Sequence, residues 1–125
     1  MAILESGEMY LEAIYRLSCS APAVRSIDVA DYLGVSKPSV SRAMGLLKRD
    51  GFVTADESGF LRLTGAGEAR AKEIYERHAV LTELFVRLGV DAETAANDAC
   101  RIEHYISGRT FDAIKAHMEK YGHGE

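Results

Sequence analysis

The sequence predicts a mostly α-helical chain in two parts, joined by one short pair of strands. Apolar residues recur at helical spacing through most of the 125 residues. Serine, threonine and aspartate residues that cap helices alternate with glycines that end them. Two short runs, 52–54 and 60–63, are typical of β-strands.

Two helices are predicted at the start of the chain. Ser6 is the expected N-cap of a helix that runs to about residue 18. Ser26 is the expected N-cap of a second helix, which stops at Gly34 because glycine readily adopts the left-handed conformation. We expect the second helix to bury its apolar residues Ile27, Val29, Ala30 and Leu33.

A third helix and a hairpin complete the first part. Ser36 caps this helix, Pro38 stands in its first turn, where a missing N–H costs nothing, and Gly51 ends it. The strand-like runs 52–54 and 60–63 are separated by a polar loop and predict a hairpin. Helix, helix, turn, helix and hairpin is the order of a winged helix-turn-helix.

The second part is predicted to be wholly helical. Each of its helices begins at a good capping residue, namely Thr64, Asp91 or Thr110. We expect these helices to cover approximately residues 64–88, 91–106 and 110–121. The expected domains are therefore 1–70 and 71–125.

Composition limits the function classes. The formal net charge of −4 argues against general coating of nucleic acid, so any DNA contact needs a local basic patch. Such a patch exists between Lys37 and Arg62. No apolar run approaches the roughly 18 residues of a membrane-spanning helix, and the start lacks a basic leader, so we expect a cytoplasmic protein with no membrane partner. Two cysteines, Cys19 and Cys100, are too few for a disulfide framework.

The third helix has the outward face expected of a helix that reads the major groove of double-stranded DNA. Arg42 can donate a bidentate pair to guanine, and the helix N-terminus favours phosphate oxygens. A polar helix start that binds nothing is the alternative, but the turn at Gly34 and the following hairpin favour DNA binding. The candidate DNA-contacting residues are Ser36, Lys37, Pro38, Ser39, Ser41 and Arg42.

A cluster of metal-ligating residue types lies in the second part. Cys100, Glu103 and His104 occupy positions i, i+3 and i+4 of a predicted helix, so their side chains leave one face together. Further candidate ligands, distant in sequence, are Met9, Glu12 and His78. Thiolate, imidazole, carboxylate and thioether donors together suit iron(II), cobalt, nickel or zinc better than calcium or magnesium.

Each candidate ligand also has an ordinary structural explanation. Met9 would usually be a core residue, Glu12 a solvated one, and a lone cysteine a small buried apolar group. The combination of Glu103 and His104 is harder to explain in this way, because burying them side by side is costly without a cation. A metal held by both groups of ligands would join distant parts of the chain and could control DNA binding.

The chain resembles the iron- and manganese-dependent repressors typified by the diphtheria toxin repressor and the manganese transport regulator. The resemblance covers nearly the whole chain and rests on GEMYLEAIY at 7–15, SKPSVS at 36–41, RDG at 49–51, RH at 77–78 and DACRIEH at 98–104. It implies a homodimer that binds a palindromic operator and represses metal-uptake genes. It also implies that the second part both binds metal and dimerises. From the length we expect the two-domain form, without an SH3-like domain.

The resemblance also implies a ligand set. The residues that match the primary site of the iron-type proteins are Met9, Cys100, Glu103 and His104. Glu12 and His78 match the second-metal ligands of the manganese type, in which Glu103 would bridge both ions and a carboxylate stands at the position of Cys100. Thr82 and Ala96 depart from the iron-type ancillary site, so we expect no such site.

The predicted function is thus a metal-dependent transcriptional repressor that senses Fe(II) or Mn(II). The sulfur donors of Met9 and Cys100 favour Fe(II), because Mn(II) prefers carboxylates and stands lowest in the affinity order. Co(II), Ni(II) or Zn(II) would substitute in vitro. One alternative is a winged-helix regulator switched by oxidation of Cys100. Another is a Cys100–His104 enzyme, but no glycine-rich oxyanion turn accompanies this pair, so we expect no enzyme.

Overall fold

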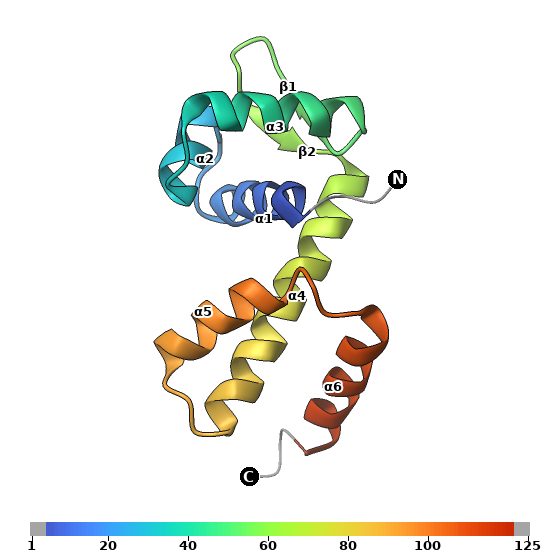
Figure 1. Ribbon diagram of the computed structural model, residues 1–125. Coiled ribbons are helices and arrows are strands. Elements are labelled where there is room, and N and C mark those ends of the chain that lie inside the picture. The colour runs from blue at the N-terminus through green and yellow to red at the C-terminus, as the bar shows by residue number, and fades with distance from the viewer. Residues whose placement is uncertain (1–4, 122–125) are drawn as a thin grey trace. The chain divides into compact units, whose positions relative to one another are not determined.

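The computed structural model describes residues 5–121, with side chains from residue 7 onward. Within this range the chain is mostly α-helical with one two-stranded hairpin, which confirms the predicted fold class (Figure 1). The elements are α1 Glu5–Ser20, α2 Ser26–Leu33, α3 Lys37–Arg49, β1 Val53–Ala55, β2 Leu61–Leu63, α4 Gly65–Arg87, α5 Ala92–Ile102 and α6 Gly108–Tyr121. Two compact units, 1–73 and 74–125, divide within α4.

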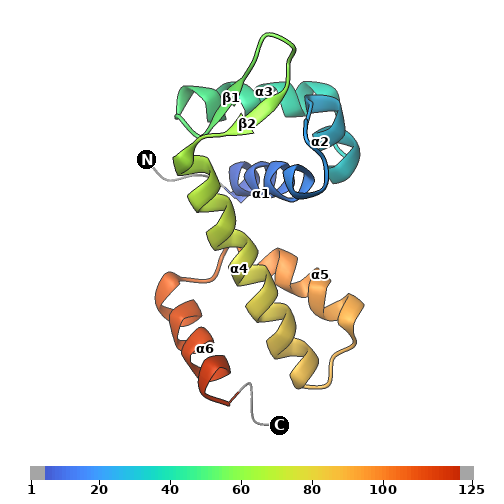
Figure 2. The same ribbon diagram turned by 180° about the vertical axis from the view of Figure 1, so that it is seen from behind.

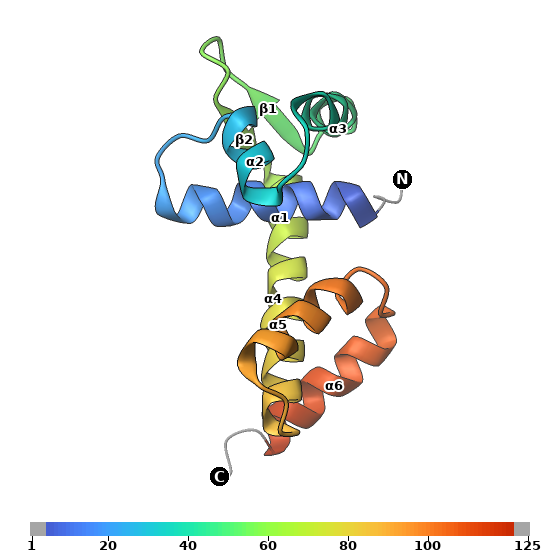
Figure 3. The same ribbon diagram turned by 60° about the vertical axis from the view of Figure 1, so that its left-hand side comes forward.

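The first unit has a core built from α1, α2 and α3. Leu11, Ile14, Val29 and Val40 are each 0% exposed, and burial of such side chains is worth about 1.5–3 kcal/mol apiece. Figure 3 shows α3 end-on where α1 is seen lengthwise, so the two helices cross. This crossing holds the opposite face of α3 toward solvent.

A backbone hydrogen bond joins the hairpin to the segment between α1 and α2. β1 and β2 are antiparallel, with Val53 opposite Leu63. The amide of Leu61 donates to the carbonyl of Val24 at 2.7 Å, which forms an isolated bridge beside β2. The carboxylate of Asp56 accepts two backbone N–H groups of the hairpin loop. The loop of the hairpin therefore has a defined conformation, which the side chain of Asp56 stabilises.

Three predicted helix starts are confirmed by their capping hydrogen bonds. The side-chain oxygens of Ser36, Thr64 and Asp91 each accept from the amide three residues on, at 3.2, 3.0 and 3.0 Å. Each bond satisfies an N–H group that has no partner within its helix. The bond from the Thr94 amide also holds the pKa of Asp91 below its ordinary value.

Other predicted helix starts were wrong by one or more residues. α1 already includes Ser6, and α2 begins at Ser26 itself, with Arg25 as its N-cap. The capping contact of α2 comes instead from the carboxylate of Asp28, which accepts the backbone N–H of Arg25 at 2.9 Å. α6 begins at Gly108, two residues before the predicted cap Thr110, whose amide donates to the hydroxyl of Ser107 at 3.1 Å.

The predicted burial of Ile27 was also wrong. Ile27 is 44% exposed, whereas Val29 is 0% and Ala30 5% exposed. Residues two positions apart on a helix face in nearly opposite directions, so Ile27 and Val29 cannot both face the core. α2 buries the face that carries Val29 and Ala30.

The second unit consists of the later part of α4 with α5 and α6. Figures 1 and 2 show α5 and α6 flanking this part of α4. Ile74, Leu81, Ala99 and Phe111 are among its core residues, each 5% exposed or less. No helix of the described range is both long and apolar enough to cross a membrane.

Candidate metal centre and DNA-binding helix

His78, Cys100 and Glu103 come together in the second unit. One donor atom from each of the three lies within 4.8 Å of the others. α4 supplies His78, α5 supplies Cys100, and Glu103 is the C-cap residue of α5. The grouping places an imidazole and a thiol beside one carboxylate, whose two oxygens could serve one cation or two.

Glu103 is the most unusual residue of this cluster. Its side chain is 0% exposed, and its Oε1 lies 3.0 Å from Nδ1 of His78. Its Oε2 has no hydrogen-bond partner among the described residues, although Nε2 of His104 lies 3.3 Å away. Burying a carboxylate oxygen that accepts no hydrogen bond is costly, and a bound cation offsets the cost. The residues present therefore fit a first-row divalent metal.

His104 does not share a helix with Cys100, so this part of the prediction was wrong. α5 ends at Ile102, and His104 lies in the turn that follows. Its side chain is nevertheless only 4% exposed, with Nε2 3.3 Å from the Glu103 carboxylate. The backbone stays helical at Glu103, the C-cap of α5, whose amide donates to the carbonyl of Ala99.

Met9 and Glu12 lie on α1, in the first unit. Their environments differ from the ordinary ones for these residue types, because Met9 is 37% exposed and Glu12 only 7% exposed. Arg16, one turn later, places its guanidinium 2.8 Å from the Glu12 carboxylate. α1 thus buries a carboxylate and exposes a thioether.

Arg77 is a residue of the site that sequence reasoning missed. Its guanidinium donates through Nη1 to the backbone carbonyls of Glu103 at 3.2 Å and Ile106 at 2.9 Å. The only signal in the sequence was its position next to His78. Nothing local in the chain indicated that it reaches a turn 26 positions away.

The candidate DNA-contacting residues lie at the beginning of α3. Lys37, Pro38, Ser41 and Arg42 are exposed. Ser36 has a capping task, because its hydroxyl donates to the Ser39 hydroxyl at 2.8 Å as well as accepting the amide of that residue. The start of α3 therefore presents two cations on an N-terminus whose first N–H groups favour anions.

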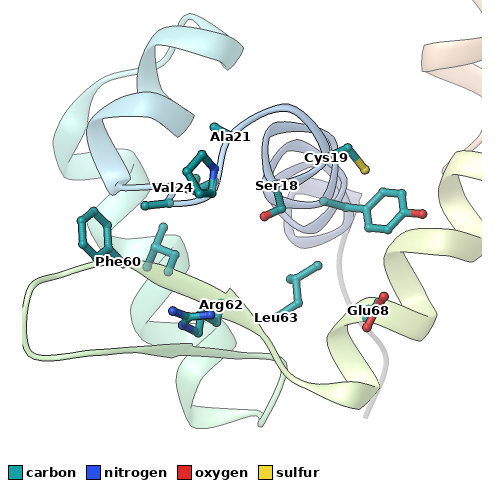
Figure 4. A pocket seen from close by; sticks show the side chains of 12 residues that line it. Ser18, Cys19, Ala21, Val24, Phe60, Arg62, Leu63 and Glu68 are labelled. Carbon is teal, nitrogen blue, oxygen red and sulfur yellow. The ribbon is translucent and has the colours of Figure 1, made fainter.

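A hollow of about 450 Å³ lies on the first unit between the C-terminal end of α1 and β2. Figure 4 shows Ser18, Cys19, Arg62 and Glu68 among the side chains around it. None of the candidate metal or DNA residues lines it. The charged groups in its lining, Arg62 and Glu68, have opposite signs, so the hollow does not select for an ion of either sign.

Two family profiles together match most of the chain. The profile described as "Iron dependent repressor, N-terminal DNA binding domain" matches residues 2–59. The one described as "Iron dependent repressor, metal binding and dimerisation domain" matches residues 64–123.

Curated relatives match over nearly the same extent. The transcriptional regulator MntR of Salmonella typhimurium is 35% identical over 113 residues, which are 90% of this chain and 72% of the relative. The HTH-type transcriptional regulator MntR of Lysinibacillus sphaericus is 34% identical over 109 residues, which are 87% of this chain and 78% of the relative. These relatives are named as transcriptional regulators, not enzymes.

Solved structures share the fold. A manganese-dependent transcriptional repressor in complex with manganese has a TM-score of 0.83 at 27% identity, covering 90% of this chain and 52% of that one. The manganese regulator SloR has a TM-score of 0.79 at 25% identity, covering 95% of this chain and 55% of that one. This chain thus spans about half the length of both. The chain belongs to the iron- and manganese-dependent repressor family, and it is a metal-dependent transcriptional repressor that binds operator DNA as a homodimer.

Proposed function

We propose that this repressor senses Fe(II) or Mn(II) in the cytoplasm and controls genes for the uptake of that metal. The observation that carries the proposal is the cluster of His78, Cys100 and Glu103, whose donor atoms lie within 4.8 Å of one another. The fully buried carboxylate of Glu103 gives the cluster a need for a cation. Residues 1–70 would form the DNA-binding domain and 71–125 the domain that holds metal and dimerises.

The proposed ligands form two overlapping sets. The residues that would hold the first ion are Met9, Cys100, Glu103 and His104. Glu12 and His78 would hold a second ion together with Glu103, whose two carboxylate oxygens allow it to serve both. Two of these six residues belong to the first unit and four to the second.

This division of ligands between the units would couple metal binding to DNA binding. A bound cation would supply the positive charge and the ligand bonds that favour one arrangement of the two units. In that arrangement, the recognition helices of the homodimer would reach successive major grooves of a palindromic operator, about 34 Å apart. A difference of roughly 5 kcal/mol between arrangements suffices to convert a mostly incompetent dimer into a mostly competent one.

Two observations bear on the choice of metal, and they favour different ions. The thiol of Cys100 and the thioether of Met9 favour Fe(II), because sulfur donors suit Mn(II) poorly. Relatives at 34–35% identity are named MntR, and two similar structures are those of a manganese-dependent repressor and of the manganese regulator SloR. Fe(II) is our first candidate on the chemistry of the ligands, and Mn(II) is the second on the names of the relatives.

A titration of operator binding with each metal in turn, without oxygen, tests the proposal. We expect Fe(II) or Mn(II) to raise operator affinity by at least tenfold, a coupling of about 1.4 kcal/mol. Cys100→Ala should lose more of the response to Fe(II) than of the response to Mn(II). Cys19→Ala, which removes an exposed thiol from the first unit, is the matched control. Equal operator affinity with and without every metal would refute metal sensing.

A second candidate function is suggested by the exposure of the Cys100 thiol. Peroxide would oxidise this thiol to a sulfenic acid and would itself be reduced to water. In the same titration, this function requires that peroxide releases DNA from the wild type but not from Cys100→Ala, and that a chelator has no effect.

The beginning of α3 provides a separate prediction about DNA. Arg42→Ala should weaken operator binding roughly 10- to 100-fold, the usual effect of losing a bidentate contact to guanine. Fluorescence anisotropy with labelled operator measures the effect. Lys72→Ala removes the same charge from α4, where Lys72 pairs with Glu68 at 3.4 Å, and is the control. Similar losses in both variants would show that only net charge matters.

A further inference from the structure

Two consecutive residues of α4 hold different parts of Glu103. The imidazole of His78 lies 3.0 Å from its carboxylate, and the Arg77 guanidinium donates to its backbone carbonyl at 3.2 Å. The same guanidinium nitrogen donates to the carbonyl of Ile106 at 2.9 Å. Arg77 therefore binds the turn 103–106 at its first and last residues.

These hydrogen bonds satisfy backbone carbonyl groups that have no partner within a helix. Carbonyl groups at and beyond the end of α5 have no partner within a helix, and a half-buried carbonyl without a partner is costly. A charged donor makes a stronger bond than a neutral one, and a cation is favourable at the C-terminal end of a helix. One guanidinium thus fixes the turn that carries Glu103 and His104.

The guanidinium is itself held in place from the other side. It lies over the ring of Phe111 at 5.5 Å, which ties it to α6. The preceding residue, Glu76, pairs with Lys115 of α6 at 2.7 Å, and this contact raises the pKa of Lys115. Arg77 is therefore fixed between the ligand-bearing turn and α6.

We propose that Arg77 is a positioning residue of the metal centre. By holding two carbonyls of the turn, it sets where the side chains of Glu103 and His104 leave the backbone, without touching an ion. The inference rests on the proposed function, since it takes these two residues as ligands. The two effects of Arg77 on metal affinity are opposite. Positioning the ligands raises the affinity, whereas the positive charge of Arg77 close to the site lowers it by repulsion of the metal ion.

The variants Arg77→Ala, Arg77→Gln and Arg77→Lys separate these effects. Alanine removes both the bonds and the charge, and glutamine keeps a donor without the charge. Lysine keeps the charge without the planar fork. If Arg77 positions the ligands, metal affinity should fall roughly 10- to 100-fold in Arg77→Ala, the range for loss of a group that orients a ligand, and less in Arg77→Gln.

Hydrogen exchange of the metal-free protein gives a readout that is independent of metal. The amides of Tyr105 and Ile106 donate to the carbonyl of Ile102 at 2.9 and 3.0 Å, so their exchange reports opening of the turn. We expect exchange on the order of tenfold faster in Arg77→Ala, from loss of hydrogen bonds to a charged donor. The Co(II) absorption spectrum should also change, because the ligand geometry changes.

Lys115→Ala is the matched control. It removes the contact between α6 and Glu76 but leaves the bonds from Arg77 to the turn. It should keep the wild-type Co(II) spectrum and exchange rates in the turn. If Arg77→Ala does not fold, Arg77→Gln and the wild type make the same comparison.

Unchanged exchange in the Arg77 variants, or metal binding that is equal or tighter, overturns the inference. A wild-type protein that binds no metal overturns the proposed function, and with it the role of Arg77 at a metal centre. The exchange rates then still decide whether Arg77 holds the turn, so the two failures are distinguishable.

Discussion

Glu103→Gln is expected to remove most of the response to metal while leaving the metal-free protein at least as stable as the wild type. Glu103 is 0% exposed and has one carboxylate oxygen without a hydrogen-bond partner among the described residues. Glutamine has nearly the same size and shape but carries no charge, so it removes the cost of burying an anion. It also removes the negative ligand common to both proposed ion sites.

Thermal or denaturant unfolding with and without metal measures both parts of this prediction. At a free metal concentration 100-fold above its Kd, the wild type should gain about 2.7 kcal/mol in the free energy of unfolding. If the variant binds roughly 100-fold more weakly, the gain falls to about 0.4 kcal/mol at the same concentration. Operator binding by the variant should then change much less on addition of metal than that of the wild type.

Glu93→Gln is the control, because Glu93 is an exposed carboxylate in the first turn of α5. It should keep the full metal response. A Glu103→Gln protein that still gains stability from metal would remove Glu103 from the ligand set. A strong loss of stability in its metal-free form would instead show that the carboxylate is satisfied by His78 and His104.

Gly67→Ala is expected to destabilise the first unit more than any surface substitution in it. Gly67 is buried in the first turn of α4, and a Cβ atom there would overlap the backbone carbonyl oxygen of Phe52. That carbonyl accepts the Thr64 amide at 3.0 Å, so it cannot move away freely. Overpacking against fixed backbone costs about 3 kcal/mol, and alanine regains at most about 1 kcal/mol in helix propensity. The net loss should be roughly 2 kcal/mol.

Gly65→Ala is the matched control for this prediction. It lies in the same helical turn, and nothing would lie within 4 Å of its Cβ. It should be neutral or stabilising by up to about 1 kcal/mol. Urea unfolding of the two variants and the wild type gives the comparison. Equal stability of the two variants would mean that α4 does not approach the backbone before β1 as closely as described.

The helix starts show what local sequence can predict and where it fails. Ser36, Thr64 and Asp91 begin helices as expected, since a capping bond joins groups three residues apart. Ser26 and Thr110 have the same residue types but stand inside helices, because a neighbouring residue supplies the cap. Residue type alone does not decide between adjacent capping candidates.

The candidate metal site likewise contains some residues that the sequence alone could group and others that it could not. Cys100 and Glu103 could be paired from the sequence, because residues three apart on a helix share a face. His78 was a candidate ligand by its residue type, and only the family resemblance assigned it to a site that it shares with Glu103. Met9 and Glu12 stay predicted ligands on the same basis.

The sequence by itself determined the helical fold class and the helix-turn-helix order, and it predicted the candidate ligand types, because these follow from residue types and their spacing along one chain. Only the tertiary structure decided that Glu103 is fully buried, that His78 lies 3.0 Å from it and that Arg77 holds its carbonyl. These contacts join residues 25 or 26 positions apart. They depend on how α4 packs against α5 and the following turn, which no local preference of the backbone specifies.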